Sequence, residues 1–153
     1  MLLGHIGIGF AGKTIGKKMP LWLLLIAVMI PDLMSFFFIL IGLADETGFW
    51  SHSLLMTTAF SAISSVIIFI IYRHFYEVLV FCGLIYSHWL CDYISWPLEV
   101  IGMSNGINIF SAKKTYGLGL YQTLPGALLC EFTLLFLGIG LYIISYRYKN
   151  KSK

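Results

Sequence analysis

Four apolar runs, each roughly 20 residues long, constrain the fold of this chain more than any other feature. They cover residues 21–43, 50–72, 78–97 and 124–146. A run of this length with few charges is typical of a membrane-spanning helix, because it matches the thickness of the hydrocarbon core. A composition of 59% hydrophobic and 11% charged residues excludes an ordinary soluble domain. We therefore predict an all-α polytopic membrane bundle with four transmembrane helices, forming a single domain over residues 1–153.

The segments outside the spans are shorter and more polar, apart from the first. Residues 2–12 are apolar and glycine-rich but too short to cross a bilayer, which predicts a short N-terminal half-helix. Residues 7–14 match the phosphate-loop pattern GxxxxGK[ST], but a membrane span follows instead of an α/β domain. Close packing by small residues explains these glycines better. Residues 99–123 predict a long loop, and residues 147–153 form a basic tail.

The distribution of lysine and arginine predicts the orientation in the membrane. Most of them flank one end of the predicted spans: Lys13, Lys17, Lys18, Arg73, Arg147, Lys149, Lys151 and Lys153, against only Lys113 and Lys114 at the other end. By the positive-inside rule, both termini are predicted to be cytoplasmic. The net charge of +3 therefore indicates a membrane partner rather than nucleic acid.

Four of the ionisable residues in the predicted spans lie at a similar depth. His88 and Asp92 are one turn apart on the same helix face, Asp32 follows Pro31 in the first span, and Glu131 is the one acid of the fourth span. A rise of about 1.5 Å per residue places all four in one layer, slightly outside the midplane. An ionisable group at such a depth costs roughly 2.5 to 3.5 kcal/mol, so these residues are expected to face each other.

Together with histidines, the acidic residues can form a metal site. Imidazole together with carboxylate is the ligand set of zinc and related divalent ions, and His5 and His52 would add to His88. His52 reaches the layer only if its helix is tilted or the preceding loop dips inward. His5 reaches it only if the half-helix re-enters the membrane.

Two further roles follow from such a metal site. A bound ion with one open position lowers the pKa of a water molecule toward about 7, and a carboxylate that is not a ligand, Glu131 or Asp32, can act as the general base. Ser51, Ser53 and Ser87 flank the histidines, either as groups that orient them or as helix caps and packing residues.

Several pieces of the sequence resemble one known family. They are GHIGIGFAGK with His5, Pro31-Asp32, WSHSLL with His52, SHWLCD with His88 and Asp92, GLGL at 117–120, and Glu131. Together they resemble small bacterial inner-membrane proteins related to metal-dependent hydrolases, which are compared with zinc-dependent phospholipase C and P1 nuclease. The resemblance implies a divalent ion, zinc or alternatively manganese, bound by His5, Asp32, His52, His88 and Asp92, with Glu131 as a further candidate. Met34 departs from the PDxD motif of those hydrolases, which argues against a second metal ion.

Three functions are compatible with these observations. The preferred one is a membrane-embedded, metal-dependent hydrolase of a lipid or lipid-linked phosphate or ester in the bacterial inner membrane. Intramembrane acids and histidines also mark proton or cation pathways, and a homo-oligomer could supply the symmetry that four spans lack. A metal-stabilised scaffold without catalysis is the third possibility.

Overall fold

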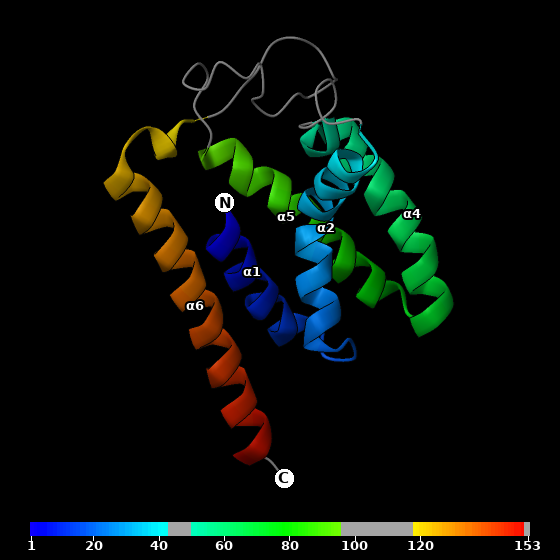
Figure 1. Ribbon diagram of the computed structural model, residues 1–153. Helices are drawn as coiled ribbons and strands as arrows, with labels where there is room; N and C mark the ends of the chain where they lie inside the picture. Colours follow the sequence, from blue (N-terminus) through cyan, green and yellow to red (C-terminus); the bar gives the residue numbers. More distant parts are fainter. Residues whose placement is uncertain (43–49, 96–117, 152–153) are drawn as a thin grey trace.

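The computed structural model describes residues 1–42, 50–95 and 118–151, and within these ranges the chain forms helices and no strand. Figure 1 shows the arrangement. The elements are α1 (Leu2–Ile15), α2 (Leu21–Leu40), η1 (Trp50–His52), α4 (Leu54–Tyr72), α5 (Phe75–Ser95), η2 (Leu120–Gln122) and α6 (Leu124–Lys151). Four of them, α2, α4, α5 and α6, are long and apolar enough to cross a membrane. The all-α, multi-pass prediction is thus confirmed.

Several predicted boundaries differ from the structure. The second spanning helix begins at Leu54 instead of residue 50, because the Ser53 hydroxyl accepts the N–H of Met56 at 3.2 Å and caps the helix there. The third helix, α5, begins at Phe75, so Glu77 lies buried in its first turn and not in a loop. The fourth continues to Lys151 through the predicted basic tail.

The predicted 99–123 loop lies mostly outside the described residues. Of this range, the structure describes residues 118–123, which include η2. The N–H of Leu118 donates to the carbonyl of Tyr93 at 2.9 Å and so attaches the start of this segment to α5.

Side chains of α2 and α5 form the main core. Leu24 and Val28 from α2 pack with Phe81 and Ile85 from α5, and Ile68 adds α4 to the same cluster. All five side chains are buried although their helices are candidate spans. This packing fixes the relative position of the two helices that carry Asp32 and the His88–Asp92 pair.

The short helix α1 lies between α6 and the core (Figure 1). Its glycines allow close contacts on several sides, as the sequence predicted. The backbone of Gly7 lies against the backbone of Leu134 and Gly138 in α6, and neither glycine leaves room for a Cβ atom. Gly12 packs against the side chain of Leu84 in α5. The glycine-rich segment therefore serves packing between helices.

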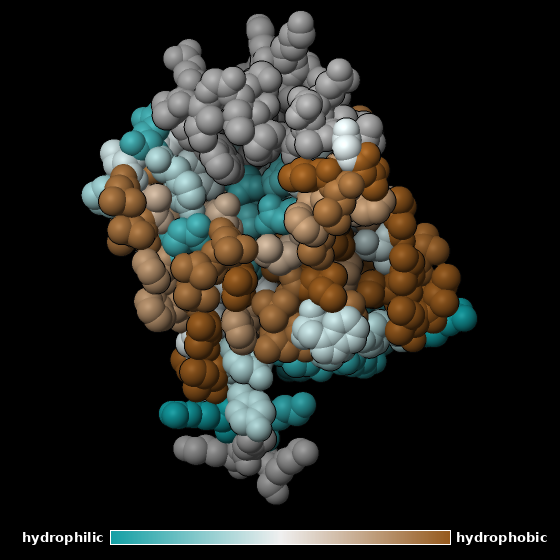
Figure 2. Space-filling view, in the orientation of Figure 1, coloured by the Kyte–Doolittle hydropathy of each residue, from teal (hydrophilic) through white to brown (hydrophobic). Residues whose placement is uncertain are grey.

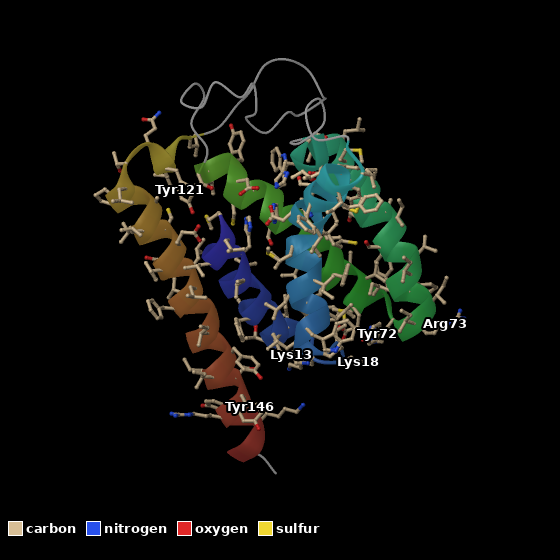
Figure 3. All side chains as sticks on the ribbon, in the orientation of Figure 1. Lys13, Lys18, Tyr72, Arg73, Tyr121 and Tyr146 are labelled. Atoms are coloured by element: carbon tan, nitrogen blue, oxygen red, sulfur yellow. The ribbon has the colours of Figure 1, made fainter. Side chains whose placement is uncertain are left out.

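Basic residues gather at one end of the bundle. Figure 3 shows Lys13, Lys18 and Arg73 at this end, and Tyr121 at the opposite end. The ammonium group of Lys13 donates to the carbonyls of Gly16, Lys17 and Met19, which closes the turn between α1 and α2. The side of the membrane on which this end lies stays a prediction.

Candidate metal centre

Five histidine and aspartate side chains from four elements converge inside the bundle. His5 comes from α1, Asp32 from α2, His52 from η1, and His88 and Asp92 from α5. They form two overlapping groups, His5–His88–Asp92 and Asp32–His52–His88. In each group the potential ligand atoms lie within 4.8 Å of one another. The structure therefore brings together all five residues that the resemblance implies as metal ligands.

The position of His52 depends on the short helix η1. Because α4 begins only at Leu54, residues 50–52 turn back toward α2 instead of extending the spanning helix. His52 Nε2 lies 3.1 Å from Asp32 Oδ1 and 3.7 Å from Asp92 Oδ2. The short helix η1 thus brings His52 to the other site residues.

The protonation of His88 follows from its backbone partner. His88 Nδ1 lies 2.6 Å from the carbonyl oxygen of Val28, which can only accept a hydrogen bond. Nδ1 therefore carries a proton, and Nε2 is the ring atom that faces the rest of the cluster. This atom lies 3.0 Å from Asp92 Oδ2 and 3.8 Å from Asp32 Oδ1. Nε2 is buried and has no hydrogen-bond partner among the described residues, so it is placed to bind a cation together with a carboxylate.

His5 approaches the two carboxylates from their other oxygens. Its Nε2 is 3.4 Å from Asp92 Oδ1, and its Nδ1 is 3.9 Å from Asp32 Oδ2. The ring is fully buried and stacks on His88 with 3.8 Å between ring centroids. Within the described part of the chain, neither ring nitrogen has a hydrogen-bond partner. Buried polar atoms without a partner are rare, and a cation could bind the ring nitrogen that carries no proton.

Hydroxyl groups orient His52. Its Nδ1 lies 3.0 Å from Ser51 Oγ and 3.3 Å from Ser35 Oγ, and the two hydroxyls also contact each other. Sequence reasoning named Ser51 but missed Ser35, although Ser35 follows Asp32 by three residues and so shares its helix face. Ser53 caps α4, and Ser87 donates to the Leu84 carbonyl of its own helix at 2.7 Å.

Glu131 belongs to neither group of potential ligands. Its carboxylate accepts the N–H of Leu2 at 3.0 Å and the N–H of Gly4 at 2.6 Å. The acid thus lies at the N-terminus of α1. Its predicted role as a general base stays a prediction.

One side of the cluster is open. The Asp32 side chain is 39% exposed, whereas His52 is 13% exposed and the other three are at most 3% exposed. Figure 2 shows hydrophilic surface recessed between two apolar surfaces near the N-terminal end of α1. Asp32 is therefore the member that a molecule from outside would meet first.

Comparison of the chain with protein-family models, with curated proteins and with solved structures finds no match. The chemistry of the site is therefore inferred from its geometry.

Imidazole nitrogens and carboxylate oxygens are the donors that bind divalent transition metals in proteins. With bonds of about 2.0 to 2.2 Å, tetrahedral ligands are about 3.3 to 3.6 Å apart. The separations above, 3.0–3.9 Å between His and Asp atoms of the cluster, bracket this range. The cluster can hold a metal ion.

Proposed function

We propose that this protein is a membrane-embedded, metal-dependent hydrolase that acts on a lipid or lipid-linked phosphate or ester. The observation that supports it most is the buried Nε2 of His88, which lies 3.0 Å from Asp92 Oδ2 and 3.8 Å from Asp32 Oδ1. A divalent cation would bind this nitrogen and the Asp92 carboxylate at once. Zinc suits a mixed nitrogen and oxygen donor set, and manganese is the alternative.

The residues divide into ligands and a base. His52, His88 and Asp92 are the less exposed donors and are assigned as ligands, with His5 adding a donor from the buried side. A bound divalent ion supplies a water molecule of lowered pKa and polarises an ester or phosphoryl oxygen. The Asp32 carboxylate lies on the open side and is assigned as the general base. Ser35 and Ser51 hold the His52 ring so that Nε2 points to the cluster.

The surroundings of Asp32 favour an amphiphilic substrate. Leu33 and Phe36 are exposed on α2 next to it, and Phe36 lies one turn further on the same helix face. On a helix that crosses the membrane, such side chains contact lipid. An amphiphile could place its phosphate or ester group at Asp32 while its hydrocarbon part lies along Phe36. We assign the protein to the bacterial inner membrane, with the lysine-rich end of the bundle in the cytoplasm.

The test combines metal analysis with a hydrolysis assay. Purified wild-type protein is expected to contain about one equivalent of zinc or manganese by elemental mass spectrometry. His88→Ala should weaken metal binding by more than about 100-fold, because loss of an outer partner of a ligand alone costs about 10- to 100-fold. The control is His74→Ala, since His74 is exposed and lies outside both ligand groups. Metal-loaded wild-type protein should hydrolyse phosphatidylglycerol in detergent micelles, and His88→Ala should not.

The other outcomes select between the remaining functions. Wild-type protein that neither contains nor takes up metal would end the proposal. Stoichiometric metal without hydrolysis of phosphatidylglycerol or of a lipid-linked phosphate would favour the scaffold. Cation or proton flux in proteoliposomes that is lost in Asp92→Ala would favour transport.

A further inference from the structure

The N-terminus of α1 receives its cap from another helix. The first amide groups of a helix have no partner within the helix itself. Glu131, about two turns after the start of α6, supplies acceptors for two of them, through Oε1 to Leu2 and through Oε2 to Gly4. Its negative charge also suits the positive end of the helix dipole. One acidic side chain therefore joins α6 to the first turn of α1.

This cap lies directly beside the metal centre. Gly4 precedes His5, whose ring stacks on His88 and faces Asp92. A helix of 14 residues is only marginally stable by itself, so the position of its first turn depends on external contacts. The place of the His5 ring is thus coupled to the two hydrogen bonds of Glu131.

A second contact fixes the register of α6 against α1. About two turns after Glu131, the backbone of Gly138 lies against the carbonyl of Gly7. At the other side of Glu131, Tyr121 in η2 interacts with the carboxylate, and burial together with this carboxylate raises the pKa of the Tyr121 phenol. The phenol stays protonated at physiological pH. The carboxylate therefore has defined neighbours on both sides.

We infer that Glu131 is a positioning residue: its carboxylate fixes the first turn of α1 and thereby holds His5 against His88 and Asp92. The inference rests on the proposed function only in its metal-binding readout. It assigns to Glu131 a role different from that of a metal ligand or a general base. Its direct consequence is that a change in α6 alters the position of a histidine in α1.

The experiment compares Glu131→Met and Glu131→Gln with the control Leu129→Met, because Leu129 is an exposed residue of the same helix. Three readouts are used in detergent: amide hydrogen exchange of residues 2–5, the ¹⁵N signals of the His5 ring, and binding of Co²⁺ followed by its visible spectrum. In Glu131→Met we expect exchange at least about 10-fold faster, shifted His5 signals, and Co²⁺ affinity about 10- to 100-fold lower. Glutamine keeps one acceptor oxygen, so its effects should be intermediate, and Leu129→Met should match the wild type.

Unchanged His5 signals in Glu131→Met would overturn the inference. So would weaker Co²⁺ binding with unchanged exchange, because that pattern identifies a ligand instead of a cap. If the methionine variant does not fold, Glu131→Gln decides by the same signals. Wild-type protein that binds no Co²⁺ or zinc would count against the proposed function alone, since the exchange and His5 readouts need no metal.

Discussion

Helices α5 and α6 are both long enough to cross a membrane, but they are held in the bundle in different ways. Half of the most apolar stretch of α5 is buried, against 6% for α6. Phe81 and Ile85 of α5 belong to the main core, and His88 and Asp92 to the metal centre. By contrast, α6 packs mainly on α1, through the backbone near Gly138 and through Glu131.

This difference follows from the physics of helices in lipid. Lipid chains are as apolar as leucine, so helices gain little from hiding apolar side chains from lipid. Helices associate instead through close packing and hydrogen bonds. In α5 these contacts involve many side chains, whereas in α6 they include the close backbone contact of Gly138 with Gly7 and the two hydrogen bonds of Glu131. Single changes should therefore disturb α6 more than α5.

The largest effect in this comparison is expected for Gly138→Ala. A Cβ atom at this position meets the backbone of Gly7, which cannot move aside as a side chain would. Overpacking of this kind costs about 1 to 3 kcal/mol, so the free energy of unfolding should fall by that amount. Unfolding in mixed micelles with increasing sodium dodecyl sulfate measures it. The matched control is Gly140→Ala on the same helix, which has nothing within 4 Å of its Cβ position. Equal stability of the two variants would refute the backbone contact.

A smaller effect is expected where the metal centre is supported by several partners. In Ser35→Ala, His52 loses the hydroxyl 3.3 Å from its Nδ1 but keeps that of Ser51 at 3.0 Å. We expect Zn²⁺ affinity to fall by about 10-fold, the lower end of the range for lost outer partners. Isothermal titration of the metal-free protein measures this value. Ser87→Ala should leave the affinity unchanged, because the Ser87 hydroxyl bonds to the Leu84 carbonyl. A loss of more than about 100-fold in Ser35→Ala would indicate a larger role for Ser35.

Much of this arrangement could be predicted from periodicity and length. The apolar runs gave the four long helices, and the i, i+4 spacing placed His88 and Asp92 on one face. The depth of His52 could not be predicted. A straight helix that begins at residue 50 places His52 outside the layer of the other site residues, whereas η1 turns inward. Contacts between helices could not be predicted from the sequence either. Neither the Ser35 contact with His52 nor the Glu131 cap on α1 has a fixed spacing in the sequence.

The smallest effect is expected for a glycine of α5, Gly83, and tests the comparison with α6. Gly83 is a glycine inside α5 whose Cβ position has nothing within 4 Å, in contrast to Gly138 in α6. Alanine has a higher helix propensity than glycine by about 1 kcal/mol in a helix interior. Gly83→Ala should therefore raise the free energy of unfolding by up to about 1 kcal/mol and leave metal binding unchanged. The same micelle unfolding series measures it beside Gly138→Ala. If both alanines destabilise alike, α5 depends on close backbone approach as α6 does, and the contrast between the two helices fails.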